Sequence, residues 1–209
     1  MVLVGKKAPI FSAKAVVNGV EIVENFSLEQ YVGKKYVLFF FYPADFTFVC
    51  PTELIAFQDK IADFDSRDTV VVGASTDSEF SHWKWLQTPT NEGGIQGVKY
   101  PLVADQSLCI SKAYDVLAGK TTYDEEGNEV FEGVPQAYRG LFLIDKSGIV
   151  RHQLVNDMPL GRSVSEAMRL IDALQFTEEY GEVCPADWEK GDQALKPTQE
   201  GIANYLSSH

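Results

Sequence analysis

The chain has 209 residues, 45% of them hydrophobic, and a net charge of −12. This length allows one sizeable core and does not require two domains. The negative charge repels nucleic-acid phosphates and anionic membrane surfaces, so we predict neither as a partner. No apolar run approaches the ~20 residues that span a bilayer, and no leader is recognisable before Pro9, so we expect a cytoplasmic protein.

Three cysteines, Cys50, Cys109 and Cys184, are too few for a dense disulfide framework. In a reducing compartment an odd number of cysteines indicates catalytic or free thiols. The three histidines have no spacing typical of metal ligands. We therefore predict neither a metal nor a cofactor.

The first predicted elements are a β-hairpin and a buried strand. Segments 13–17 and 20–23 flank Asn18-Gly19, a strong hairpin signal because both residues tolerate positive φ. Residues 36–42 form an unbroken apolar run, which is typical of a strand covered on both faces.

The next predicted element is a helix whose first turn contains Cys50. The apolar spacing becomes helical from Leu54, and Pro51 fits the first turn because its missing N–H costs nothing there. Backbone N–H groups and the helix dipole at this position favour an anion, so they favour a reactive thiolate. Glu53 opposes this effect, and we therefore expect an arginine from elsewhere in the chain to pair with it.

The pattern then alternates between strand and helix, which implies parallel strand pairing. Residues 69–75 predict a second buried strand, and residues 76–79 predict a capping box. The following helix is expected to bury Phe80, Trp83 and Leu86 on its inner side.

The middle of the chain predicts shorter elements. They are a strand at about 99–103, a short helix at 108–114 in which Cys109 is a small buried residue, an exposed hairpin or flap at 121–133, and an antiparallel hairpin of 141–144 with 149–155.

The last part of the chain predicts one long helix, then an arm. Ser163 is expected to cap the helix. Residues 177–196 are acidic and show no sustained spacing of apolar residues. Pro197 can start a last short helix. We predict an α/β domain over 1–176 and a C-terminal arm over 177–209.

Residues Pro43 to Cys50 match the pattern P-x-x-x-T-x-x-C, and their surroundings resemble the alkyl hydroperoxide reductase C and thiol-specific antioxidant group of the peroxiredoxins. Segments 139–145, 161–163 and 181–188 also resemble typical two-cysteine members, in the family's order. The resemblance implies a thioredoxin-like fold: a mixed central sheet flanked by helices, with an N-terminal β-hairpin and a C-terminal extension.

The resemblance also implies a thiol-dependent peroxidase. Cys50 is then the nucleophile and becomes a sulfenic acid. Thr47 is expected to hydrogen-bond to the thiolate and the peroxide, Arg139 to supply a permanent positive charge, and Pro43 to shield the sulfur from water.

The roles of the arginines depend on this context. Taken alone, Arg139 would be a solvated residue at a strand end. Arg162 either pairs with Glu53 or stays on the surface before a helix cap, and the sequence leaves both interpretations open.

By resemblance, Cys184 of a second subunit resolves the Cys50 sulfenic acid as a disulfide. This implies at least a homodimer, and rings of five dimers are common among relatives. The expected electron donor is thioredoxin or a flavoprotein disulfide reductase, and the preferred peroxide stays open.

Two further elements resemble those that govern sensitivity to overoxidation in the family. Gly93, Gly94 and Gly97 lie in a variant of the GGLG loop, and Tyr205 and Leu206 replace a Tyr-Phe pair. Both differ from the family pattern, so we expect intermediate sensitivity.

Alternative functions are a general thiol–disulfide exchange protein and a ring-forming holdase chaperone. The first usually needs two closely spaced cysteines, which are absent here. His82 could act as the base of a cysteine hydrolase, but we interpret it as a packed or interfacial histidine.

Overall fold

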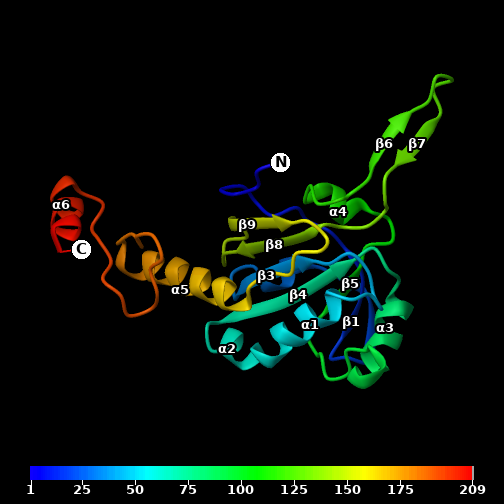
Figure 1. Cartoon of the computed structure of the whole chain (residues 1–209), viewed down its shortest axis with the longest axis horizontal. Coiled ribbons are helices and arrows are strands. Elements are labelled where there is room, and N and C mark those ends of the chain that lie inside the picture. Colours follow the sequence, from blue (N-terminus) through cyan, green and yellow to red (C-terminus); the bar gives the residue numbers. More distant parts are fainter. Residues whose placement is uncertain (209) are drawn as a thin grey trace. The chain divides into compact units, whose positions relative to one another are not determined.

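The computed structural model describes residues 1–208, which form two compact units that divide after Arg162. The first unit is built on a seven-stranded mixed sheet in the order β2-β1-β5-β4-β3-β8-β9 (Figure 1). Strands β3, β4 and β5 are parallel, and the outer neighbours pair antiparallel. The strands are β1 (Ala13–Val17), β2 (Glu21–Phe26), β3 (Tyr36–Phe41), β4 (Thr69–Ser75), β5 (Leu102–Ala104), β8 (Arg139–Ile144) and β9 (Val150–Asn156).

The predicted hairpin and buried strands are confirmed. Asn18 and Gly19 both have positive φ, 54° and 77°, in the turn between β1 and β2. A Cβ on Gly19 would lie 2.9 Å from the Val98 carbonyl oxygen, so the turn also needs glycine for close approach. All residues of β3 are buried, as expected for a strand with helices on both faces.

Helices cover both faces of this sheet. On one side lie α1 (Cys50–Asp59), α2 (Ile61–Asp65) and α3 (Glu79–Gln87), and on the other lies α4 (Cys109–Ala113) (Figure 1). Side chains alternate along β3: Phe40 stacks on Phe57 of α1 at 4.7 Å between ring centroids, whereas Phe39 and Phe41 meet Tyr114 at 5.1 and 5.3 Å. Two short 3₁₀ helices, Leu28–Tyr31 and Thr90–Glu92, complete the unit.

The predicted cap of α3 is wrong by two residues. Ser78 is the N-cap, and its Oγ accepts a hydrogen bond from the Ser81 N–H at 3.2 Å. Thr76 instead donates its hydroxyl to the Pro135 carbonyl at 2.9 Å. The tertiary contact of Thr76 therefore replaces the local capping interaction that the pattern indicates.

The predicted inner face of α3 is also wrong, apart from Leu86. Phe80 and Trp83 are 67% and 41% exposed, while His82 is buried. The reason is a polar network that fixes the rotation of the helix: His82 Nδ1 lies 2.9 Å from Asp45 Oδ2. His82 is therefore a packed histidine, as interpreted from the sequence.

Both ring nitrogens of the buried His82 lie against hydrogen-bond acceptors, which favours the doubly protonated ring. Nδ1 faces the Asp45 carboxylate and Nε2 faces the Val103 carbonyl at 3.2 Å, and both groups only accept. Burial disfavours the charged ring, but the charge and hydrogen bond of Asp45 outweigh it and raise the pKa of His82 above its ordinary value of 6.5.

This network predicts a pH dependence of stability. A raised pKa means that His82 stabilises the fold fully below about pH 6.5 and loses this contribution as pH rises through the folded-state pKa. Denaturant unfolding at a fixed protein concentration measures this effect. The free energy of unfolding of wild type should exceed that of His82→Gln by less as pH rises above 6.5, and this difference should fall by at most roughly 1.4 kcal/mol per pH unit. A gap that widens with pH would contradict the charged state.

The region around α4 differs from the prediction in two ways. Strand β5 begins at Leu102 rather than near 99. Cys109 is exposed, whereas Ile110 and Ser111 are buried. The buried Asp105 carboxylate accepts the backbone N–H groups of Ile110 and Ser111, at 3.0 and 2.7 Å, so these residues face inward and Cys109 faces outward.

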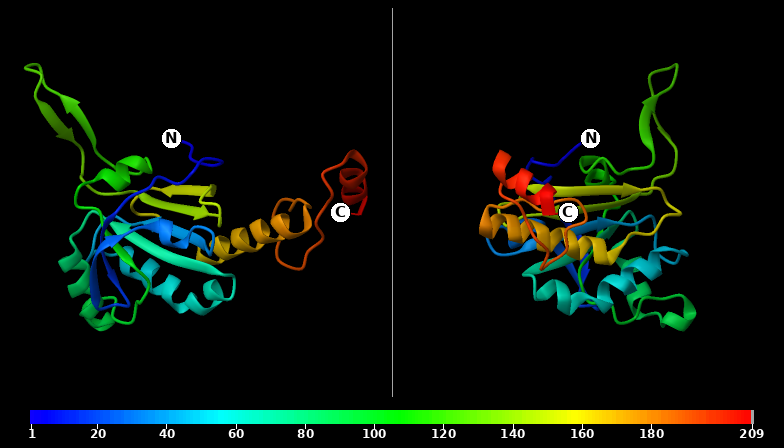
Figure 2. Two further views of the ribbon diagram at one scale, coloured as in Figure 1. Left: turned by 180° about the vertical axis from the view of Figure 1, so that it is seen from behind. Right: turned by 60° about the vertical axis from the view of Figure 1, so that its left-hand side comes forward.

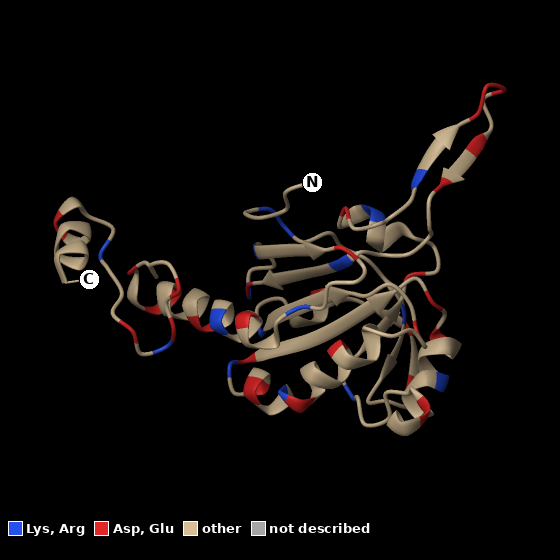
Figure 3. Cartoon of the chain, viewed as in Figure 1, with Lys and Arg blue, Asp and Glu red and all other residues tan. Residues whose placement is uncertain are grey.

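The predicted hairpin at 121–133 is confirmed. It consists of β6 (Lys120–Tyr123) and β7 (Glu129–Glu132), which form a separate two-stranded sheet. It projects away from the main sheet (Figure 2), and its tip is acidic (Figure 3). The hairpin of β8 and β9 is confirmed as well.

The second unit contains α5 (Val164–Tyr180) and α6 (Gln199–Ser208). Ser163 caps α5, because its Oγ accepts from the Glu166 N–H at 3.2 Å. Helix α5 continues through the predicted domain boundary at 176/177 and ends at Gly181, whose φ of 68° suits a helix C-terminus. None of the described helices is long and apolar enough to cross a bilayer.

Candidate active site

Cys50 is the first residue of α1, directly after the loop that leaves β3. Its side chain is fully buried. Pro51 follows in the first turn, where no N–H is needed. The positive end of the helix dipole therefore lies next to the Cys50 sulfur and favours negative charge there.

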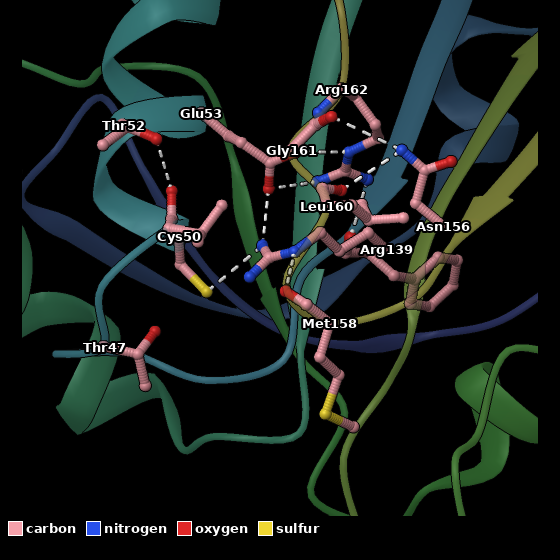
Figure 4. Close-up of polar contacts among 12 residues, drawn as sticks. Thr47, Cys50, Thr52, Glu53, Arg139, Asn156, Met158, Leu160, Gly161 and Arg162 are labelled. Atoms are coloured by element: carbon pink, nitrogen blue, oxygen red, sulfur yellow. Dashed lines mark hydrogen bonds and ion pairs between the residues drawn. The ribbon is translucent and has the colours of Figure 1, made fainter.

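Arg139, the first residue of β8, faces this sulfur. Its Nη1 lies 3.5 Å from Cys50 Sγ (Figure 4). Its Nε donates to the Met158 carbonyl oxygen at 2.6 Å, which fixes the orientation of the guanidinium plane. Arg139 is buried, so its charge acts on the sulfur with little screening by water.

Glu53, one turn after Cys50, pairs with two arginines rather than with the one that is expected from the sequence. Arg139 Nη1 donates to Oε2 at 2.6 Å. Arg162 donates from Nε to Oε1 and from Nη2 to Oε2, both at 2.8 Å, and its backbone N–H adds a third bond to Oε1 at 2.8 Å (Figure 4).

The charges in this cluster do not cancel. Burial by itself raises the pKa of Glu53, but the hydrogen bonds and charge of Arg162, together with the charge of Arg139, lower it below its ordinary value. Glu53 is therefore ionised at neutral pH. Two guanidinium groups against one carboxylate leave one net positive charge beside the Cys50 sulfur.

Arg162 is buried and also donates hydrogen bonds to two backbone carbonyl groups, which no sequence pattern indicates. Its Nη1 donates to the carbonyl oxygens of Phe41 at 2.8 Å and Gly140 at 2.6 Å. A Cβ on Gly140 would lie 2.7 Å from Val116 Cγ1, so this position needs glycine. Every residue has a backbone carbonyl group. Hydrogen bonds to the carbonyls of Phe41, Gly140 and Met158 therefore leave no pattern in the sequence.

Thr47 and Pro43 lie on the loop before Cys50. Thr47 lies beside the Cys50 thiol (Figure 4), but its hydroxyl donates to the Ala44 carbonyl oxygen at 2.8 Å, which differs from the predicted bond to the thiolate. One hydroxyl has a single proton to donate, so in this state only its lone pairs can face a substrate. Pro43 is buried.

The two elements predicted to govern sensitivity to overoxidation, the glycine loop and the Tyr205-Leu206 pair, lie in different units. Gly93, Gly94 and Gly97 follow α3, and Trp85 Nε1 donates to the Gly93 carbonyl at 2.9 Å. Tyr205 and Leu206 lie on α6.

Cys184 lies in the second unit, in the loop after α5. All three cysteines of the chain are free thiols. Cys184 Sγ contacts the Ala173 carbonyl oxygen at 3.7 Å and Thr177 Oγ1 at 3.8 Å.

Two protein-family models match most of the chain. The AhpC/TSA family matches residues 4–153, and the C-terminal domain of 1-Cys peroxiredoxin matches residues 173–208. The chain is 47% identical to alkyl hydroperoxide reductase C of Helicobacter pylori over 99% of this chain and 98% of that protein. It is 47% identical to peroxiredoxin-2 of Mus musculus over 99% and 96%.

Among solved structures, the reduced 2-Cys peroxiredoxin of Plasmodium vivax superimposes with a TM-score of 0.88 at 44% identity, covering 99% of this chain and 100% of that one. The thioredoxin-like fold expected from the sequence is confirmed. The chain therefore belongs to the AhpC/TSA family and is a thiol-dependent peroxidase of the peroxiredoxin type.

Proposed function

We propose that the chain reduces hydrogen peroxide and organic hydroperoxides by direct attack of the Cys50 thiolate on a peroxide oxygen. The S–O bond forms as the O–O bond breaks, giving a Cys50 sulfenic acid and water or an alcohol. One observation carries the proposal: the buried Cys50 Sγ lies 3.5 Å from Arg139 Nη1 in a cluster with net positive charge.

The surrounding groups suit the charge that develops in this reaction. The departing oxygen gains negative charge, and the Arg139 guanidinium can stabilise it without reorganising because Glu53 and Met158 already hold it. The lone pairs of Thr47 Oγ1 can accept a hydrogen bond from the O–H of the bound hydroperoxide. Pro43 is buried in the loop, which supports a role in keeping water from the thiolate.

We further propose that Cys184 of a partner subunit resolves the sulfenic acid. Its thiolate attacks the Cys50 sulfur, a disulfide forms, and water leaves. A dithiol donor, thioredoxin or a flavoprotein disulfide reductase, then reduces the disulfide. A chain with only three cysteines fits a reducing compartment, so we propose a cytoplasmic role in antioxidant defence. Peroxide-dependent oxidation of NADPH, coupled through each donor in turn, tests this sequence.

Cys184→Ser should react with peroxide once and then stop. Cys50 still forms the sulfenic acid, but no second thiol condenses with it, so steady-state turnover with thioredoxin should fall to background. Mass spectrometry should show a product one oxygen heavier. On non-reducing gels, peroxide-treated wild type should migrate as a covalent dimer and the variant as a monomer. A steady-state rate equal to wild type would mean that Cys109 or an external thiol resolves Cys50.

The proposed dimer assembles further into a ring of five dimers. Strand β9 lies at one end of the sheet, where a second copy can pair with it. Separately, four aromatic side chains on the Cys50 loop and α3 are exposed: Phe46, Phe48, Phe80 and Trp83. Exposed aromatic groups of this kind are typical of protein interfaces.

Phe48→Glu should therefore convert the reduced ring to dimers. Phe48 is 93% exposed, so the change costs little in the subunit itself and places a charge where the proposed interface is apolar. Sedimentation velocity measures the outcome. Tyr123→Glu on the β6–β7 hairpin, where Tyr123 is also exposed, is the matched control and should leave the ring intact. Equal sedimentation of both variants and wild type would contradict this interface.

A further inference from the structure

The segment that carries Cys184 folds back on α5, where Cys184 Sγ contacts the Ala173 carbonyl oxygen, and it is closed by its own contacts. Val183 and Leu195 exchange two backbone hydrogen bonds, at 2.9 and 3.1 Å, which tie the two ends of the loop together. Trp188 lies between these ends and is only 2% exposed. Its ring is 5.1 Å from that of Phe176 on α5, so the loop is anchored on the helix by an aromatic contact.

Arg169 adds a polar clamp to this anchor. Its Nε and Nη2 donate to the two carboxylate oxygens of Glu166, one turn earlier on α5, at 2.6 and 2.7 Å. The remaining arm of the guanidinium, Nη1, donates to the Trp188 carbonyl oxygen at 3.0 Å. Glu166 therefore holds the guanidinium in one orientation, and Arg169 holds the backbone of the loop.

The same loop turns Cys184 toward the helix. Sγ contacts the Ala173 carbonyl oxygen and Thr177 Oγ1, and the residue is only partly exposed. To attack any other sulfur, Cys184 must leave these contacts. That movement is opposed by the Trp188 anchor and the Arg169 hydrogen bond, because both hold a residue only four positions away.

We propose that Arg169 and Trp188 form a latch that keeps Cys184 on α5 in the reduced chain, so that opening of this loop controls how fast the disulfide forms. Arg169 is then a positioning residue. The proposal rests on the proposed function of Cys184 as the resolving thiol. A tighter latch prolongs the sulfenic acid and exposes it to a second peroxide, which converts it to sulfinic acid.

The latch can be measured without the peroxidase reaction. In the full chain with Cys50→Ser and Cys109→Ser, Cys184 is the single thiol, and its alkylation by iodoacetamide is followed from pH 6 to 10. The rate plateau at high pH reports access to the thiolate, whereas the midpoint reports the local charge. Arg169→Gln should raise the plateau about fivefold, the change expected for loss of one hydrogen bond worth roughly 1 kcal/mol.

Lys190→Ala is the matched control. Lys190 also joins this loop to α5, through Asp172 at 3.7 Å, but its side chain is 72% exposed, so its loss should leave the plateau within about twofold. Trp188→Leu should raise the plateau more than Arg169→Gln does. Circular dichroism checks that α5 is intact. An unchanged plateau in either Arg169→Gln or Trp188→Leu would overturn the latch.

A second experiment connects the latch to catalysis. With all cysteines present, Arg169→Gln should leave the rate of Cys50 oxidation unchanged, speed disulfide formation about fivefold, and lower the fraction of sulfinic acid at high peroxide. Rapid-quench mass spectrometry resolves the three species. Unchanged disulfide formation would overturn the proposal. Failure of wild-type Cys50 to react with peroxide would instead refute the proposed function and leave the alkylation result standing.

Discussion

Replacing Cys50 by serine should abolish peroxide reduction and leave the fold intact. A serine hydroxyl does not ionise near neutral pH, so the nucleophile disappears although the positive cluster around Arg139 stays in place. The expected steady-state rate is that of peroxide with the donor system alone. The measurement is donor-coupled peroxide consumption, together with circular dichroism and thermal unfolding of the same sample.

Cys109→Ser is the control for this change. Cys109 is exposed on α4 and makes no contact with the Cys50 cluster among the described residues, so its loss should leave the rate at the wild-type value. Peroxide turnover that survives Cys50→Ser, with the fold intact, would remove Cys50 from its catalytic role.

Glu53→Gln should lower the free energy of unfolding by about 3–5 kcal/mol, the cost of removing one partner from a buried ion pair. The amide keeps the size of the side chain but not its charge. Arg139 and Arg162, both buried, would then face each other without a carboxylate between them. Denaturant unfolding at pH 7 measures the loss.

Asp68→Asn is the matched control on the surface. Asp68 also pairs with two cations, Lys146 at 2.5 Å and Lys35 at 3.4 Å, but all three side chains are more than 40% exposed. Water and salt screen such pairs, so the expected loss is below about 1 kcal/mol. Similar losses in Glu53→Gln and Asp68→Asn would mean that the cluster is solvated in solution.

The pH dependence of Glu53 gives an independent check. Its folded-state pKa is lowered, so its contribution to stability is present above the unfolded-state value of about 4.3 and is lost as pH falls through the folded-state pKa. The difference between wild type and Glu53→Gln should therefore shrink below about pH 4.

The sequence by itself determined most of the strands and turns, and the place of Cys50 at the start of a helix. The run at 36–42 predicts a strand because an apolar segment of that length fits a sheet covered on both faces. Asn18-Gly19 predicts a turn because few residues accept its backbone conformation. The change of period before Leu54 and the position of Pro51 place Cys50 in a first helical turn. Each of these signals is local, so no distant residue was needed to read it.

The tertiary structure alone decided which faces are buried and what surrounds the thiol. The rotation of α3 follows from the bond between His82 and Asp45, residues that are 37 positions apart, so the apolar spacing at Phe80 and Trp83 could not reveal it. Cys109 faces outward because the Asp105 carboxylate accepts the N–H groups of Ile110 and Ser111 and so holds these residues inward.

The charge beside Cys50 was likewise decided by contacts between distant residues. Arg139 and Arg162 meet Glu53 across 86 and 109 residues, and backbone carbonyls with no sequence pattern orient both. A sequence motif can predict which cation lies near the thiolate. That two arginines share one carboxylate follows only from the folded chain, because the net charge beside the sulfur depends on distances across the sheet rather than on spacing along the chain.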